Sequence, residues 1–364
     1  MKALLLVAQL ITFACFSFAQ TTAAQHFESG RTLAESKDFA LAIIEFSKAI
    51  ALDPNYVDAY FQRGLAREAN KNFAGSILDL TKVIEVQPTN AEAYYSRGHA
   101  RMTMGDSDGA AEDFSKAIEL NPDHAKAYYF RGVIRGYRLD GAGEMDDYAK
   151  AISLDPKFED AYFARGIARD SKGDHAGALQ DFTEAIKANP NSKQSLYARA
   201  HLRQRMEDFN GAIADLTKLL KLDPNDVEAY LMRGNARHSN KDYDGAIADF
   251  TKVVLLDPND PNLGTIYSSR GDSRKQKGDY EGAMADYSKA LEIHPDADGY
   301  VNLGEMKFNV NDYQGALAMF AKALELEPDR ASIYKKRAAV YRRLNDVKRA
   351  KSDEKRAYYL LRTH

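Results

Sequence analysis

Cysteine and tryptophan are the residue types that this 364-residue chain most nearly lacks, with one cysteine and no tryptophan. The single cysteine, Cys15, lies in an apolar run at the N-terminus. The rest of the chain therefore has no thiol for a disulfide, a thiolate metal site or a cysteine nucleophile. Acceptor sequences for N-glycosylation are also absent, which favours a bacterial envelope or periplasmic protein over a eukaryotic secreted one.

The composition places the chain among packed soluble proteins. Hydrophobic residues make up 45% of it, charged residues 28% and aromatic residues 10%. These fractions exclude a disordered, collagen-like or polytopic membrane protein. Because the chain is long enough for two or three ordinary domains, we expect modules or repeats.

Residues 1–19 have the features of a secretory signal peptide. One lysine precedes an apolar stretch that is too short to span a bilayer comfortably, and Ser17 and Ala19 are spaced as at a signal-peptidase site. We expect cleavage after Ala19 and a periplasmic or extracellular location. Two alternatives remain: an uncleaved anchor, and a lipoprotein signal using Cys15, against which the polar Thr12 counts.

A period of 34 residues fills the rest of the chain. Prolines recur at this spacing at Pro54, Pro88, Pro122, Pro156, Pro190, Pro224 and Pro258. Two further prolines, Pro295 and Pro328, continue the series after an insertion at residues 261–263, which we expect in a turn. A fixed period of this length indicates an array of structural repeats.

Each repeat predicts two helices. Residues 227–260 show the pattern almost complete: apolar and small residues recur every three or four positions, which places them on one face of each helix. A helix-interior slot is nearly always glycine, namely Gly30, Gly64, Gly98, Gly132, Gly166, Gly234, Gly271 and Gly304. Since a slot in the second helix is similarly small, we expect the two backbones to approach closely between these slots.

These residues resemble the tetratricopeptide repeat (TPR) in its aromatic, Gly, Ala, aromatic, Ala and Pro positions. Ten consecutive repeats begin near Ala23, Val57, Ala91, Ala125, Glu159, Lys193, Val227, Gly264, Ala297 and Ala331. The resemblance implies an all-α fold, an α-solenoid in which about ten helix-turn-helix hairpins form a right-handed superhelix. The first helices would line a concave groove that binds segments of other proteins. We expect repeats 1–7 over residues 23–260 and repeats 8–10 over residues 264–364.

Arginine in the first helix and aspartate in the second occur together. Repeat 9 loses both charges at once, with Leu303 and Met319 in the two slots, as a paired contact requires. We predict structural ion pairs within repeats, including Arg63 with Asp79, Arg97 with Asp113 and Arg131 with Asp147, each supported by a second arginine one turn later. The alternative is an arginine ladder in the groove for acidic ligands.

An aromatic stripe is the candidate partner-binding groove. In the family geometry the residue after the first-helix tyrosine faces the concave wall, and here these residues are Phe27, Phe61, Tyr95, Tyr129, Phe163 and Tyr197. Such rings offer a large contact area at little entropic cost. The alternative is that they pack between adjacent hairpins as core. The lysine and asparagine pair of the carboxylate-clamp subgroup is absent from these slots.

Three parts of the array depart from the pattern. Residues 331–364 carry eleven Lys/Arg and three Asp/Glu, a net of +8, which is typical of a solvated capping helix or of a surface that docks on an anionic membrane or polymer. Repeat 4 has Gly141, Gly143 and Glu144 where an aromatic residue and alanine are usual, so we predict a soft point. The insertion at residues 261–263 is a second candidate hinge.

No catalytic motif occurs in the sequence. It has no HExxH, Walker loop, nucleophile elbow or Cys/His metal spacing, and its eight histidines are scattered over separate repeats. We therefore expect no enzymatic activity, no metal and no cofactor.

The sequence predicts a scaffold of the bacterial envelope or secreted space that binds other proteins, not nucleic acid, along its groove. The alternative is an envelope-associated structural protein that docks anionic surfaces, with peripheral membrane contact, through its basic C-terminal repeat.

Overall fold

The computed structural model describes residues 22–363, and these form helices joined by short turns, with no strand among them. The first described helix, α1, covers residues 22–35. The signal peptide predicted over residues 1–19, and Cys15 with it, lie outside the described residues. None of the described helices is long and apolar enough to cross a membrane.

The chain divides into two compact blocks, and the boundary in the sequence falls between Asn189 and Pro190. The N-terminal block holds repeats 1–5 and the C-terminal block holds repeats 6–10. The division predicted near residues 261–263 is a separate feature and stays a prediction; there, Pro261 and Asn262 lie in a turn and Leu263 already begins a helix.

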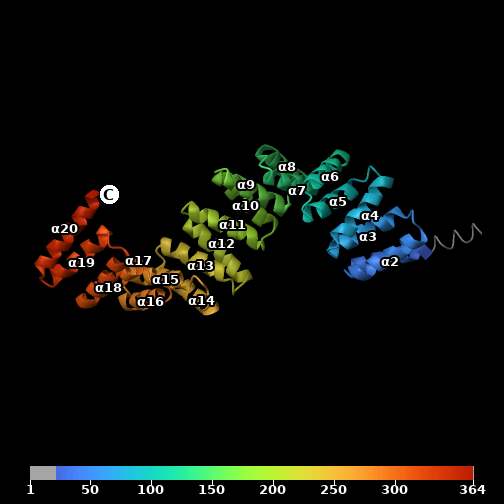
Figure 1. Cartoon of the computed structure of the whole chain (residues 1–364). Coiled ribbons are helices and arrows are strands. Elements are labelled where there is room, and N and C mark those ends of the chain that lie inside the picture. Colours follow the sequence, from blue (N-terminus) through green and yellow to red (C-terminus); the bar gives the residue numbers. More distant parts are fainter. Residues whose placement is uncertain (1–21, 364) are drawn as a thin grey trace, which may run out of the picture. The chain divides into compact units, whose positions relative to one another are not determined.

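Each repeat of the N-terminal block is one antiparallel pair of neighbouring helices (Figure 1). After α1, its helices are α2 (Phe39–Leu52), α3 (Val57–Ala69), α4 (Phe73–Val86), α5 (Ala91–Thr103), α6 (Ser107–Leu120), α7 (Ala125–Tyr137), α8 (Gly141–Leu154), α9 (Glu159–Ser171) and α10 (His175–Ala188). Odd-numbered helices are the first helices of their repeats and even-numbered helices the second.

The C-terminal block continues the same alternation of first and second helices. Its helices are α11 (Lys193–Arg205), α12 (Phe209–Leu222), α13 (Val227–Ser239), α14 (Tyr243–Leu256), α15 (Leu263–Lys277), α16 (Tyr280–Ile293), α17 (Ala297–Asn309), α18 (Tyr313–Leu326), α19 (Ala331–Arg343) and α20 (Val347–Thr363). The predicted all-α solenoid of helical hairpins is thus confirmed, repeat by repeat.

The second helix of a repeat begins at a capping residue and ends just before a proline. In repeat 7, Asp242 caps α14, and its carboxylate accepts the Gly245 N–H at 3.0 Å. The helix ends at Leu256 because Asp257 precedes Pro258, and a residue before proline is pushed out of the helical region. Asp257 accordingly has φ −132°.

In seven of the ten repeats, a ring of the second helix lies on the first-helix glycine at the core of the hairpin; repeat 2 has Leu80 in place of the ring, and repeats 6 and 10 have alanine in place of the glycine. A Cβ at Gly234 would stand 2.8 Å from Cε1 of Phe250, a contact that real Cβ atoms do not make. The close backbone approach expected between this glycine and the small slot of the second helix stays a prediction. Ala246 in that slot is fully buried, and the atoms nearest to a Cβ at Gly234 belong to the ring of Phe250.

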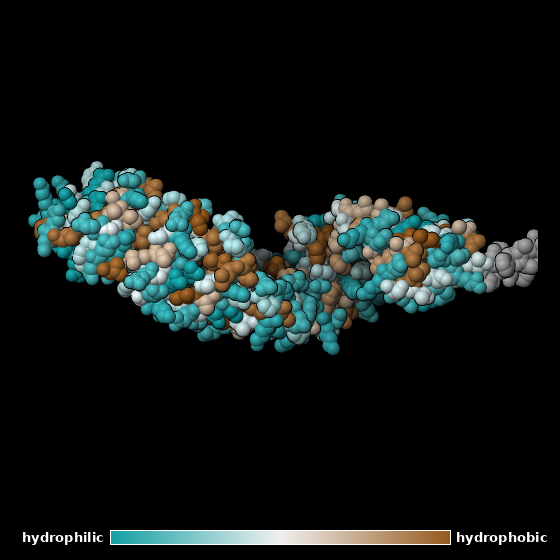
Figure 2. Space-filling model, turned by 90° about the horizontal axis from the view of Figure 1, so that it is seen from below, coloured by the Kyte–Doolittle hydropathy of each residue, from teal (hydrophilic) through white to brown (hydrophobic). Residues whose placement is uncertain are grey.

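Surface hydropathy follows this packing. Figure 2 shows a mostly hydrophilic surface on each block, with hydrophobic residues in separate groups rather than in one continuous band. Several large apolar side chains are nevertheless well exposed, and Leu139 (93%) and Tyr137 (86%) are the most exposed of those in the described residues. Both belong to repeat 4.

Candidate partner-binding surface

Four of the predicted stripe residues, Phe27, Tyr95, Tyr129 and Tyr197, contact the beginning of the next repeat, at the joint between consecutive hairpins. Of the six, Phe27 is buried, and the other five are partly exposed: Phe61, Tyr95, Tyr129, Phe163 and Tyr197. Five of the six belong to the N-terminal block, and Tyr197 belongs to the C-terminal block. The partly exposed rings therefore contribute to the core and also offer part of each ring to solvent.

The ring contacts of Tyr95 and Tyr129 show how a joint is filled. The centroid of Tyr95 is 6.0 Å from that of Phe114 in the same repeat and 4.5 Å from that of His124, which precedes the next first helix. Tyr129 repeats this arrangement with Tyr148 at 6.1 Å and Phe158 at 5.1 Å. Each ring thus packs on its own hairpin and on the beginning of the next one.

Burial raises the pKa of these tyrosines, which are neutral at pH 7 even without the shift. Desolvation, with a smaller contribution from Asp160, raises the pKa of Tyr129 to about 12. Burial likewise raises the pKa of Tyr95 well above its usual value, and the carboxylates of Glu92 and Glu68 add to the effect. At neutral pH the stripe therefore presents uncharged aromatic surface, which suits apolar or amphipathic side chains of a partner.

The structure brings the predicted arginine and aspartate side chains together. In the three pairs named from the sequence, the arginine Nε donates to Oδ2 of the aspartate at 2.9 Å and Nη2 donates to Oδ1 at 2.7–2.8 Å. The pairs are Arg63 with Asp79, Arg97 with Asp113 and Arg131 with Asp147. Such bidentate contacts between a guanidinium group and a carboxylate are among the strongest charge-assisted hydrogen bonds.

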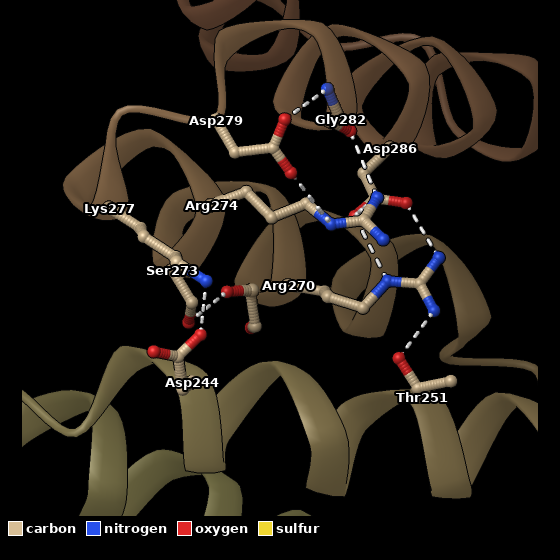
Figure 3. Close-up of polar contacts among 10 residues, drawn as sticks. Asp244, Thr251, Arg270, Ser273, Arg274, Lys277, Asp279, Gly282 and Asp286 are labelled. Carbon is tan, nitrogen blue, oxygen red and sulfur yellow. Dashed lines mark hydrogen bonds and ion pairs between the residues drawn. The ribbon is translucent and has the colours of Figure 1, made fainter.

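Repeat 8 shows the complete network (Figure 3). Arg270 binds Asp286 through both nitrogens, and Arg274 adds a third bond to the same carboxylate at 2.8 Å. Arg274 also donates to the carbonyl oxygen of Gly282 at 3.1 Å. Because these guanidinium groups are largely buried and bound to aspartate, they are not a free ladder for acidic ligands.

A link between repeats completes the network, and sequence reasoning missed it. The remaining Nη1 of Arg270 donates to Oγ1 of Thr251 in the preceding repeat at 3.0 Å. The same bond joins Arg63 to Ser47 at 3.0 Å and Arg97 to Thr81 at 3.2 Å. A hydroxyl residue 16 positions before the arginine, or 19 positions before Arg270 because of the insertion at residues 261–263, is the signal that could have revealed it.

A pocket of about 530 Å³ lies between repeats 4 and 5. Two stripe residues, Tyr129 and Phe163, line it together with Val133 and the half-exposed Ile167. The pocket also includes Glu144, one of the residues that made repeat 4 irregular in the sequence. Here two stripe residues surround a space large enough for a side chain of a partner.

The basic C-terminal repeat has a well-packed inner face. Ala350, Asp353, Ala357 and Leu360 are buried, at spacings of three and four along α20. On its other faces Tyr358, Tyr359 and Leu361 are more than half exposed. The helix covers α19 in the way a capping helix does, and it still presents aromatic and basic side chains to solvent.

Some histidines contact nearby carboxylates. His99 contacts Glu68 of the preceding repeat at 2.6 Å between Nδ1 and Oε1, and His175 contacts Asp170 at 2.7 Å. Residues 22–363 contain no cluster of three or more His, Cys, Asp or Glu side chains that could hold a metal ion.

Family comparisons agree with this geometry. Models of the tetratricopeptide repeat match residues 30–71, 91–124, 146–193, 197–261, 271–310 and 297–330, in both blocks. The chain is a tetratricopeptide-repeat protein. TPR proteins bind other proteins or peptides and are generally non-catalytic scaffolds.

Solved structures of other TPR proteins are similar to parts of this TPR chain. PilF from Pseudomonas aeruginosa is 18% identical, with a TM-score of 0.50, over 57% of this chain and 95% of its own. A TPR protein from Parabacteroides merdae is 22% identical over 69% of this chain and 98% of its own, with a TM-score of 0.44. YrrB, described as a TPR protein with an unusual peptide-binding site, is 26% identical over 51% of this chain and 94% of its own, with a TM-score of 0.47. No curated protein matches the sequence.

Proposed function

We propose that this protein is an exported, non-catalytic scaffold that binds a segment of another protein along the first helices of repeats 3–5. The observation that carries the proposal is the pocket of about 530 Å³ lined by the stripe residues Tyr129 and Phe163. Neutral, partly exposed rings on neighbouring first helices provide rigid apolar contact area for an extended segment. Export is part of the proposal and rests on the signal-like residues 1–19.

The test requires substitutions that change this surface without removing core. The stripe tyrosines pack inside the joints, so their truncation would also lower stability. Ile167 is 47% exposed and Tyr137 is 86% exposed, and both line the pocket. Ile167→Glu with Tyr137→Glu therefore places charges on the binding surface while leaving the packing intact.

The measurement is crosslinking and affinity capture of partners by the tagged full chain in its native cells. We expect the double variant to lose at least one partner that the wild type and Leu78→Glu retain. Leu78 is the matched control because it is 71% exposed on the second helix α4. Circular dichroism checks that all variants remain helical.

A second arm addresses the basic C-terminal repeat, whose exposed Tyr358 and Tyr359 favour the alternative function. Here Tyr358→Glu with Tyr359→Glu changes α20 alone. Partners or anionic vesicles that are lost in this variant but kept by the pocket variant would move the function to α20. That outcome would contradict the proposal for repeats 3–5.

A further inference from the structure

Two repeats close their hairpin with a pair of rings. In repeat 7, His238 at the end of the first helix contacts Tyr243 at the beginning of the second, with 5.6 Å between ring centroids. In repeat 9, Phe308 and Tyr313 occupy the same two positions, again 5.6 Å apart. The two positions are five residues apart and lie on either side of the turn.

In repeat 4 both positions are glycine, Gly136 and Gly141. Every other repeat has a side chain at both positions, namely Ala34/Phe39, Glu68/Phe73, Met102/Ser107, Asp170/His175, Gln204/Phe209, Lys275/Tyr280 and Arg342/Val347 in addition to the two ring pairs. Both glycines line the pocket of about 530 Å³. The pocket therefore lies where repeat 4 lacks the side chains that the rest of the array contains.

The walls of this space combine apolar side chains with one carboxylate. Leu139 and Tyr137 are almost fully exposed at its edge, although burial elsewhere in the chain is the rule for such residues. Glu144 stands where other repeats have alanine or serine, and its side chain is only 15% exposed. An apolar space with a carboxylate on its wall suits a side chain that has a large ring and a hydrogen-bond donor.

The charge of Glu144 is incompletely balanced. Lys172 Nζ is 3.5 Å from its carboxylate, whereas the same Nζ donates to the carbonyl oxygen of Gly141 at 2.8 Å. The lysine thus makes its short bond to the backbone, and the carboxylate keeps capacity to accept from a donor in the pocket. Charge complementarity therefore favours an occupant with an N–H or O–H group over a purely apolar ring.

We propose that this pocket receives one tryptophan or tyrosine side chain of the partner protein, whose N–H or O–H donates to Glu144. The inference rests on the proposed function and specifies the residue that the partner supplies. The ring occupies the place that Tyr243 and Tyr313 fill in their own repeats. A volume of about 530 Å³ lies within the range of about 300–1,000 Å³ that is usual for ligand pockets.

The probe for the test is N-acetyl-tryptophanamide, measured by saturation-transfer NMR on the full chain. The chain contains no tryptophan, so every indole signal comes from the probe. We expect binding to the wild type with a dissociation constant on the order of 1 mM, as suits a single side chain. Absence of saturation transfer to the indole protons would overturn the proposal.

The decisive variant is Gly141→Phe, which supplies the ring that repeats 1, 2 and 6 have at this position. A Cβ there would meet only the end of the Lys172 side chain, at 2.9 Å from Nζ, so the substitution is sterically accessible. We expect it to weaken binding of the probe at least tenfold. Ser107→Phe, the same change at the same position of repeat 3, is the matched control and should bind as the wild type does.

Two further variants test the chemistry of the pocket. Ile167→Glu reduces binding without inserting a ring, and it replaces Gly141→Phe if that variant is not helical. Glu144→Gln should weaken N-acetyl-tryptophanamide severalfold and leave N-acetyl-phenylalaninamide unchanged, because the latter ring has no donor. Equal effects on both probes would contradict the role of Glu144.

The outcome for the pocket is separable from that for the scaffold. A partner that Ile167→Glu with Tyr137→Glu loses but Gly141→Phe keeps would sustain the proposed function and refute the aromatic pocket. Self-association of the wild type that Gly141→Phe abolishes would identify a second copy as the occupant, and would refute a separate partner there. Loss of the same partner in both variants is the result we expect.

Discussion

Repeats 4 and 9 depart from the common pattern in opposite ways. Repeat 4 retains the ion pair of Arg131 with Asp147 but has glycine at both ring positions of its hairpin. Repeat 9 retains the ring pair, and its ion-pair slots hold Leu303 and Met319, which pack into one hydrophobic cluster. Each repeat therefore lacks what the other has.

Both repeats nevertheless fold into the same two-helix hairpin. What they share is the contact of a second-helix ring with the first-helix glycine, Tyr148 on Gly132 and Phe320 on Gly304. In these two repeats the hairpin keeps this contact while the ion pair or the ring pair is absent. The ion pair can be exchanged for apolar packing, and the missing ring pair leaves a space open to a partner.

Breaking the ion pair of repeat 4 should have the largest effect on stability. Asp147 is 3% exposed and binds both Arg131 and Arg135, so Asp147→Leu leaves two guanidinium groups without their carboxylate. We expect a loss of about 3 kcal/mol in the free energy of unfolding of this region. Chemical denaturation and hydrogen exchange of α7 and α8 measure it, and Asp146→Leu at the exposed neighbouring position is the control.

Converting repeat 4 to the repeat 9 pattern sharpens the same comparison. Arg131→Leu, Arg135→Lys and Asp147→Met together reproduce Leu303, Lys307 and Met319. This triple variant should lie within about 1 kcal/mol of the wild type, because no buried charge is left unpaired. A loss as large as that of Asp147→Leu alone would show that apolar packing cannot replace the pair in repeat 4.

Acid should weaken the region around repeat 9 more than repeat 4. Burial raises the pKa of Glu305, but bonds from Lys336 and Lys275 outweigh it, and the pKa lies below its usual value. The stabilisation is therefore present above the unfolded-state pKa of about 4.3 and is lost as the pH falls through the folded-state pKa. Repeat 4 has Val133 at this position.

The measurement is hydrogen exchange of α15, α17 and α19 between pH 5 and 3, compared with α7. Glu305→Gln should reduce the pH dependence of protection in these three helices and leave α7 unchanged. The three are compared because Glu305 bonds to lysines of the repeats on both sides, with Lys275 Nζ at 2.9 Å. An unaltered pH dependence in the variant would assign the acid sensitivity to other carboxylates.

The smallest effect concerns the joint after repeat 4. Ala149 stands where repeats 1–3, 6 and 7 have a hydroxyl residue that accepts from the arginine of the next repeat, and Arg165 accordingly makes no such bond. Ala149→Ser should stabilise the joint by about 0.5 kcal/mol through a new bond to Arg165. The reverse change, Thr81→Val, removes the 3.2 Å bond to Arg97 and should cost a similar amount in the same denaturation measurement.

The fold was predictable because each local signal agrees with the period. Proline after an aspartate or asparagine ends second helices, an aspartate begins them, and the glycine slot recurs every 34 residues. The ion pair was predictable for a different reason: repeat 9 lost both partners together. When an arginine and an aspartate are replaced together in one repeat, this double replacement indicates that the two side chains contact each other in the other repeats.

The candidate site was only partly predictable. The stripe was evident, but whether Tyr95 packs or faces solvent depends on where the next hairpin lies, and helix periodicity does not determine that. The sequence indicates that repeat 4 is irregular at Gly141, Gly143 and Glu144, and the soft point predicted there stays a prediction. The signal for the pocket is Gly136 taken together with Gly141, five residues later. Only this combination leaves both ring positions of the hairpin without a side chain.

The bond from an arginine to a hydroxyl residue of the preceding repeat, where it is present, has a consequence for how the repeat array can change genetically. Where the contacts of a joint recur with the 34-residue period, as at Arg63 and Arg97, a gene segment of 102 nucleotides encodes one hairpin together with half of each of its two joints. Duplication or loss of that segment rejoins arginine to hydroxyl and ring to glycine without new residues. The number of hairpins can therefore change in one genetic event, whereas a feature such as the paired glycines of repeat 4 must arise by substitution.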